Sequence, residues 1–216
     1  MEIVLNVYQR PLDPRYPLVC FDEGMKQLTA EVCLPLPTQP GSPAKYDYEY
    51  QRNGSANLFV FFAPLLNWRH VKVTPQRTML DFAACMRDLV DLHFPHAEKI
   101  VVVMDNLNTH RFASLYLAFP PDEAQRIMDK LDFYYTPKHG SWLNMAEIEL
   151  SVLQRQCLPG RIPDLLTLTA QVAAWEIQRN AQKATVEWQF TSADARIKLL
   201  HLYPTLIPEA STSATF

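Results

Sequence analysis

Four acidic residues lie in or directly after apolar segments of the sequence. Asp22 follows PLVCF, Asp105 follows KIVVVM, and Glu147 and Glu149 stand within WLNMAEIELSVLQ. Carboxylate oxygens are the ligands that Mg²⁺ and Mn²⁺ prefer over Zn²⁺. A divalent cation would also offset the repulsion between neighbouring carboxylates. These residue types therefore indicate a candidate metal site, provided that the fold brings the acids together.

The first two acids follow predicted strands. Residues 17–22 and 100–104 are continuous apolar runs, typical of strands buried on both faces. If these strands are parallel neighbours, Asp22 and Asp105 lie together at the carboxyl edge of a sheet, where α/β proteins place ligands. The alternative is that each Asp is a helix cap or turn residue and that the Glu is incidental. Spacing alone leaves both interpretations open.

A helix is predicted over residues 140–154, and its two acids face different ways. Glu147 falls on a stripe with Leu143, Ala146, Leu150, Leu153 and Cys157, which predicts a place on the packed face. Glu149 lies about 200° around the helix, on a rival stripe with Met145, Ile148 and Val152. Glu147 can therefore be the third ligand, but periodicity alone does not decide between the two stripes. If Glu147 is the ligand, Glu149 is structural or solvent-facing, and its change to Gln retains most activity.

The remaining pattern predicts an α/β fold with a mixed sheet and helices on both faces. Expected strands are 46–52 and 56–64, joined by a turn at Asn53-Gly54, then 68–73 and 131–135. Expected helices are 77–94, two short ones within 112–130 split at Pro120-Pro121, 167–180 and 194–203.

Composition limits the partners and the compartment. The 216 residues carry a net charge of −3 and a pI of about 6.1, whereas a dedicated nucleic-acid binder is usually basic. No apolar run approaches the roughly 20 residues of a membrane span, and the first residues do not form a secretory signal. No two of the four cysteines form a Cys-x-x-Cys pair, which argues against zinc binding by cysteine. A reducing cytoplasm is the default expectation.

Four phrases, CFDE, RNGSANLFVFF, VVVMDNLNTH and YTPKHGSWLNMAEIELSVLQR, together resemble the DDE transposases. They look most like the bacterial insertion-sequence branch of the Tc/mariner superfamily, over residues 19–204. The most specific pieces are Asp105-Asn106 followed by His110, and Ser141-Trp142-Leu143-Asn144-x-x-Glu147. The resemblance implies an RNase H-like fold with a five-stranded mixed sheet. It also selects Glu147 over Glu149 as the third catalytic carboxylate.

The resemblance implies DNA strand cleavage and strand transfer in transposition. Asp22, Asp105 and Glu147 would be the catalytic residues and would hold two Mg²⁺ or Mn²⁺ ions. Double-stranded DNA would be the partner, as transposon ends and a target with the sequence TA. A homodimer would act on paired ends, without a covalent protein–DNA intermediate.

Neighbouring residues receive supporting roles in the same hypothesis. His110, Lys138, His139 and Trp142 are candidate DNA contacts, Asn106 is expected to orient Asp105, and Asn144 to support the site. Alternatives are a helix cap for His110, a solvated loop for Lys138 and His139, and core packing for Trp142.

The expected domain organisation is a linker segment over residues 1–17, a catalytic domain over 18–204 and a disordered tail over 205–216. Two departures from the family stand out. Between Asp105 and Glu147 lie 41 residues (147 − 105 − 1), longer than usual, with the excess placed in 117–130. A helix-turn-helix region ahead of the domain is also missing. The chain is therefore expected to be a fragment, a split reading frame or a degraded copy.

Two rival interpretations remain. A phosphotransfer receiver domain also places Asp residues at strand ends, but the early meander of strands argues against its strict βα alternation. A decayed or domesticated transposase domain would act only in DNA binding or dimerisation. Divalent-metal titration would distinguish such a module from an enzyme.

Overall fold

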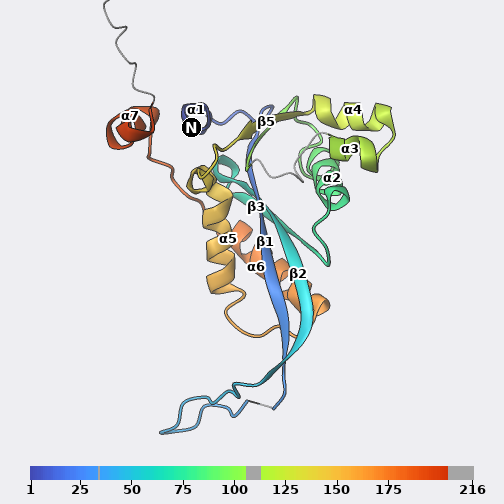
Figure 1. Cartoon of the computed structure of the whole chain (residues 1–216), viewed down its shortest axis with the longest axis vertical. Coiled ribbons are helices and arrows are strands. Elements are labelled where there is room, and N and C mark those ends of the chain that lie inside the picture. The colour runs from blue at the N-terminus through green and yellow to red at the C-terminus, as the bar shows by residue number, and fades with distance from the viewer. Residues whose placement is uncertain (34, 106–112, 204–216) are drawn as a thin grey trace, which may run out of the picture.

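The computed structural model describes residues 1–33, 35–105 and 113–203. In this part of the chain, five strands form one sheet in the order β3-β2-β1-β4-β5 (Figure 1). Strand β1 pairs antiparallel with β2 and parallel with β4, and β4 pairs parallel with β5. The predicted mixed sheet is confirmed. Its strands are β1 (Leu18–Glu31), β2 (Tyr50–Ala63), β3 (Trp68–Thr74), β4 (Ile100–Met104) and β5 (Leu131–Tyr135).

Helices cover both faces of the sheet, as the sequence predicts (Figure 1). One face packs against α2 (Met79–Asp88), α3 (Ala113–Ala118) and α4 (Pro121–Asp129). The other packs against α1 (Glu2–Tyr8), α5 (Met145–Gln156), α6 (Leu165–Ala181) and α7 (Ser192–Lys198). Short 3₁₀ turns lie at Pro64–Leu66, Ser141–Leu143 and Leu200–Leu202, and Leu89–His93 continues α2 as a π-helical turn. No described helix is long and apolar enough to cross a membrane.

The alternation of side chains along β1 decides which face receives each residue. Val19 and Phe21 belong to the core on the α2 side, whereas Cys20 belongs to the core on the α5 side. Successive side chains on a strand point to opposite faces. Asp22 therefore projects toward α5, and Glu23 toward α2.

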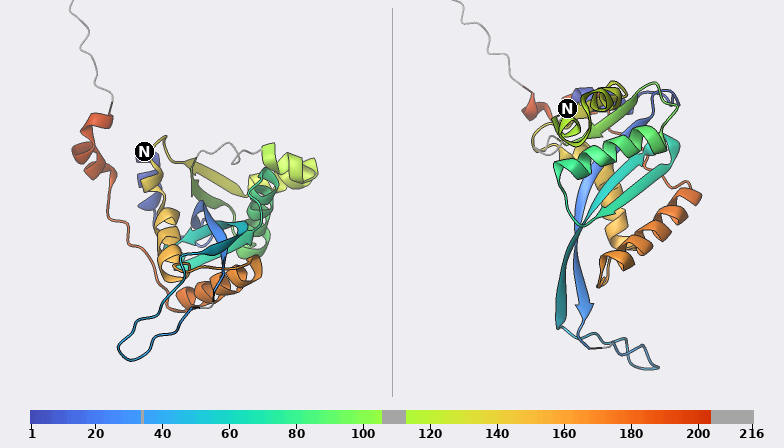
Figure 2. Two further views of the ribbon diagram at one scale, coloured as in Figure 1. Left: turned by 60° about the horizontal axis from the view of Figure 1, so that its bottom comes forward. Right: turned by 90° about the vertical axis from the view of Figure 1, so that its right-hand side faces the viewer.

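The predicted turn at Asn53-Gly54 is wrong, because these residues lie within strand β2. The register with β1 shifts between Gln27↔Ser55 and Thr29↔Arg52, so β2 carries one extra residue there. Gly54 has φ +90, a left-handed conformation that a β-bulge uses. Beyond the bulge, β1 and β2 continue as a two-stranded ribbon that extends past the helices (Figure 2).

The first residues are not a free linker in the structure. Helix α1 buries Val4, Leu5 and Val7 in the core shared with α5. The Tyr8 hydroxyl donates a hydrogen bond of 2.6 Å to the Leu143 carbonyl, directly before α5. This segment therefore braces the start of the candidate catalytic helix. The expected tail, 205–216, lies outside the described residues.

Candidate active site

The pairing of β1 with β4 brings Asp22 and Asp105 to the same place. Leu18 pairs with Val101, Val19 with Val102 and Cys20 with Val103. Two further residues along each strand, the same register sets Asp22 opposite Asp105. Paired residues of neighbouring strands lie about 5 Å apart, and their side chains share a face. The expectation that Asp22 ends its strand is wrong, because β1 continues to Glu31 in antiparallel pairing with β2. Strand β4, in contrast, ends at Met104, directly before Asp105.

The environment of Asp22 raises the pKa of its carboxyl group from 3.8 to about 7. Burial is the largest cause, and the negative charges of Glu147 and Asp105 add to it, while a 2.7 Å hydrogen bond from the Glu23 N–H opposes it. Desolvation and like charges both disfavour the ionised carboxylate. The three predicted acids therefore share one electrostatic environment.

Asn144 ties the start of α5 to the strand that carries Asp22. Its fully buried side-chain amide donates a hydrogen bond of 2.8 Å to the Phe21 carbonyl and one of 3.4 Å to an Asp22 carboxylate oxygen. The same side chain caps the helix by accepting from the Ala146 N–H at 3.1 Å. Asn144 thus fixes where α5 begins relative to Asp22.

Glu147 lies in the first turn of α5, three residues after this cap, and its side chain is exposed. The expectation that Glu147 occupies the packed face of the helix is wrong. The face that packs on the sheet carries Met145, Ala146, Glu149 and Leu153 instead. Exposure leaves the Glu147 carboxylate accessible to a cation and to a substrate from solvent.

Glu149 is the buried acid of the pair, which excludes the solvent-facing alternative. It is fully buried and forms ion pairs with Arg69 and Arg179, at 3.0 Å and 3.1 Å. Sequence reasoning missed both arginines. A signal was present for Arg69, since it alternates with Trp68 and His70 and shares its face of β3 with Val71 and Val73. A lone cation on an apolar strand face indicates a buried anionic partner.

The loop before α5 carries the predicted DNA contacts. Its four-residue turn is closed by a 2.8 Å hydrogen bond from the Gly140 N–H to the Pro137 carbonyl, with His139 at φ +62. Lys138, His139 and Trp142 line a cavity of about 460 Å³ beside it. Trp142 is 45% exposed and packs edge-on against Phe190, so one part of its ring remains open. Asn106 and His110 lie outside the described residues.

The three acids suit a hard divalent cation, although they are not closed around one. In the described ranges, no three His, Cys, Asp or Glu side chains stand close enough together to hold a metal ion. The donor set is oxygen only, partly buried and electrostatically coupled, which fits Mg²⁺ or Mn²⁺.

The extra residues between Asp105 and Glu147 do not intrude on these acids. Helices α3 and α4 contain that segment and belong to the core on the opposite face of the sheet, where α3 packs on α2 and α4 packs on α3 and β5. The long spacing is therefore accommodated away from α5.

Comparison with solved structures defines the fold class. The Mos1 mariner paired-end complex with Mn matches with a TM-score of 0.56 at 14% identity, covering 84% of this chain and 55% of that one. The Mos1 Strand Transfer Complex matches with a TM-score of 0.55 at 13% identity, covering 84% and 54%. The chain thus spans about half the length of these relatives. With its 3-2-1-4-5 sheet and helices on both faces, the fold is RNase H-like.

The family follows from the sequence model that the chain matches. Residues 17–169, most of the chain, match the DDE superfamily endonuclease model. The chain therefore belongs to the DDE superfamily endonucleases. No curated protein matches the sequence.

Proposed function

We propose that this domain cleaves and joins DNA strands in transposition, using two Mg²⁺ or Mn²⁺ ions held by Asp22, Asp105 and Glu147. The observation that carries the proposal is the parallel pairing of β1 with β4 up to Cys20↔Val103, because Asp22 and Asp105 each follow this pair by two residues and the charge of Asp105 acts on Asp22. The Leu143-Asn144-x-x-Glu147 motif further supports the bacterial insertion-sequence branch of the Tc/mariner superfamily.

The three acids act together in this mechanism. Asp22, Asp105 and Glu147 would together hold the ions, with Asp22 the acid on which the charges of the other two act. The bound ions would activate water or a DNA 3′-hydroxyl and stabilise the leaving 3′-oxygen. Asn144 holds one Asp22 oxygen and the start of α5, so that the carboxylates stay aligned during both steps.

Double-stranded DNA is the proposed partner, with a homodimer acting on paired transposon ends and TA as the target. Support comes from the Mos1 structures, which are a paired-end complex and a complex with the left transposon end. The neighbouring loop suits a DNA backbone because it presents Lys138 and His139 beside the first turn of α5. Trp142 offers an open aromatic surface on which a base can stack.

Lys138→Ala is expected to weaken DNA binding about three- to tenfold at physiological salt. Removing one phosphate contact should also reduce the slope of log affinity against log salt by about 1. Fluorescence anisotropy with duplex DNA measures both quantities. Lys99→Ala is the matched control, because Lys99 is exposed at the opposite end of β4. Equal losses in the two variants would contradict the placement of DNA at this loop.

This chain by itself is expected to bind duplex DNA weakly and with little sequence preference. Its net charge is −3, so the few cations near the site must supply the whole attraction. Anisotropy titrations with unrelated duplexes should give similar dissociation constants, on the order of 1–100 µM. Sequence-specific binding at nanomolar concentration would refute this expectation.

The test of the proposed function is Mn²⁺-dependent nicking of supercoiled plasmid, a substrate that requires no known end sequence. The wild-type chain should nick in Mn²⁺ and not in EDTA. Binding of DNA or dimerisation without any metal-dependent cleavage would favour the alternative, a decayed or domesticated transposase domain.

A further inference from the structure

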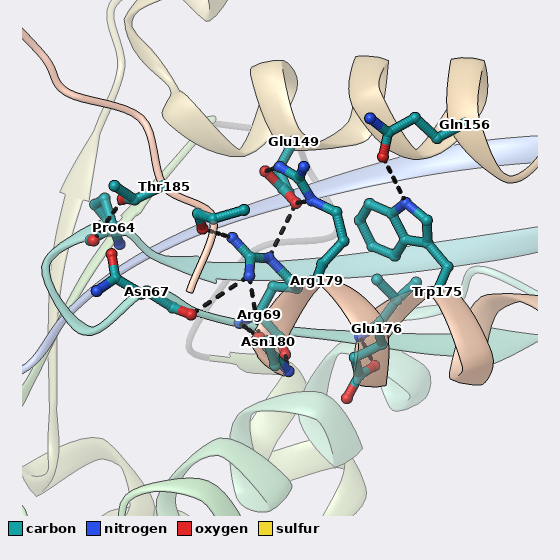
Figure 3. A network of polar contacts seen from close by, with 12 residues as sticks. Pro64, Asn67, Arg69, Glu149, Gln156, Trp175, Glu176, Arg179, Asn180 and Thr185 are labelled. Atoms are coloured by element: carbon teal, nitrogen blue, oxygen red, sulfur yellow. Dashed lines mark hydrogen bonds and ion pairs between the residues drawn. The ribbon is translucent and has the colours of Figure 1, made fainter. Parts of the chain in front are cut away.

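A buried ionic network joins Glu149 of α5 to Arg69 of β3 and Arg179 of α6 (Figure 3). The Arg69 Nε is 3.0 Å from Glu149 Oε1, and the two side chains are both 0% exposed. Arg179 of α6 reaches the same carboxylate with its Nε at 3.1 Å and its Nη2 at 3.2 Å. One helix, one strand and a second helix are thus joined at a single carboxylate.

Arg69 is itself held in place by several further contacts. Its guanidinium donates to the carbonyls of Asn67 and Ala184 and to the Asn180 side chain, and it lies 5.4 Å from the centre of the Phe62 ring. Asn180 also exchanges hydrogen bonds of 2.9 Å with the Arg69 main chain. These contacts therefore fix the position of the Arg69 guanidinium beside the Glu149 carboxylate.

Three contacts together determine how α5 lies on the sheet. Asn144 holds its first turn to β1. In the middle, Leu150 meets β1 at Gly24, where an added Cβ would be only 2.7 Å from Leu150 Cδ1. Glu149 sets the rotation about the helix axis, because a turn of α5 would separate its carboxylate from both arginines. Since Glu147 lies about 200° around the same helix, its direction follows from that rotation.

We propose that Glu149, held by Arg69 and Arg179, is a positioning residue for Glu147. Apolar packing tolerates small slides and rotations of a helix, whereas a buried carboxylate between two guanidinium groups does not. A displacement of about 1 Å at a catalytic group is enough to lower a rate about 100-fold. The inference rests on the proposed function, and it replaces the expectation that Glu149→Gln retains most activity.

The anchoring itself is tested without metal by hydrogen exchange. Glu149→Gln and the milder Arg179→Gln are compared with Ile127→Ala, which opens a cavity in α4 on the other face of the sheet. At temperatures equally far below each melting point, both network variants should speed exchange in residues 145–156 at least about tenfold relative to the control. Equal exchange rates in residues 145–156 of all three variants would overturn the proposal. If Glu149→Gln does not fold, the comparison of Arg179→Gln with Ile127→Ala decides the question.

The effect on the site is tested by Mn²⁺ affinity and by the kinetics of plasmid nicking. The network variants should bind Mn²⁺ about tenfold more weakly and lose about 10- to 100-fold in kcat, with KM for DNA unchanged and no such loss in Ile127→Ala. Wild-type affinity and kcat in the variants would overturn the positioning role. If the wild type neither binds Mn²⁺ nor nicks DNA, the proposed function fails, while hydrogen exchange still decides whether Glu149 anchors α5.

Discussion

Glu147→Gln is expected to lower metal-dependent strand cleavage about 1,000-fold or more while the fold is retained. Glutamine keeps the shape of the side chain but removes the negative charge that the cation requires, a loss of several kcal/mol of transition-state stabilisation. Because Glu147 is exposed in the first turn of α5, the substitution leaves no buried group without a partner. Initial rates of Mn²⁺-dependent plasmid nicking measure the loss of cleavage, and the far-UV circular dichroism spectrum shows whether the fold is retained.

Glu187→Gln provides the matched control. It removes the same charge from another exposed glutamate, in the segment between α6 and α7, and should leave the nicking rate within about twofold of wild type. Cleavage that survives Glu147→Gln at near wild-type rate would remove Glu147 from the mechanism.

Asp22→Asn is expected to stabilise the metal-free protein at pH 8 while abolishing its response to Mn²⁺. The Asp22 carboxyl has a pKa of about 7 in the folded protein and near 3.8 when unfolded. Between these values the folded state binds more protons than the unfolded state, so stability falls as pH rises from about 4 to about 7. Asparagine cannot ionise, so Asp22→Asn avoids this loss of stability. We place the loss at about 2 kcal/mol, less than the full pKa difference implies, because the Asp22 side chain is only partly buried and water screens its charge.

In thermal unfolding at pH 8, this difference corresponds to a melting temperature about 4–8 °C higher for Asp22→Asn in EDTA. At pH 4 the two proteins should melt within about 2 °C of each other. Added Mn²⁺ should raise the melting temperature of the wild type only, since ligand binding to the folded state adds stability by mass action. A variant that melts lower than wild type at pH 8 would contradict the proposed strain among the three carboxylates.

Local patterns in the sequence predicted much of the frame around the site. The apolar runs before Asp22 and Asp105 predict two buried strands that could lie side by side and parallel, and β1 and β4 pair in this way. The break at Pro120-Pro121 likewise predicts the boundary between α3 and α4, because proline favours the first turn of a helix.

Features that depend on distant partners were not predictable from local patterns. Asn53-Gly54 is a hairpin signal in isolation, but pairing with the long β1 strand converts it into a bulge. Local sequence gives no reason to bury the charged side chain of Glu149. Its partners Arg69 and Arg179 lie 80 and 30 residues away along the chain (149 − 69 and 179 − 149), and only the fold brings them to it. The resemblance to DDE transposases selects Glu147 as the third catalytic carboxylate, and in the structure the charge of Glu147 acts on Asp22. Helical periodicity placed Glu147 on the wrong face of the helix.

The most direct test of the central claim is a crystal structure of this chain soaked in Mn²⁺, with anomalous diffraction locating the metal. The account predicts an anomalous peak between the Asp22 and Asp105 carboxylates, with Glu147 turned toward it and oxygen ligands at about 2.1–2.2 Å. A fully occupied Mn²⁺ site elsewhere, or no peak at this position in millimolar Mn²⁺ above pH 7, would contradict it.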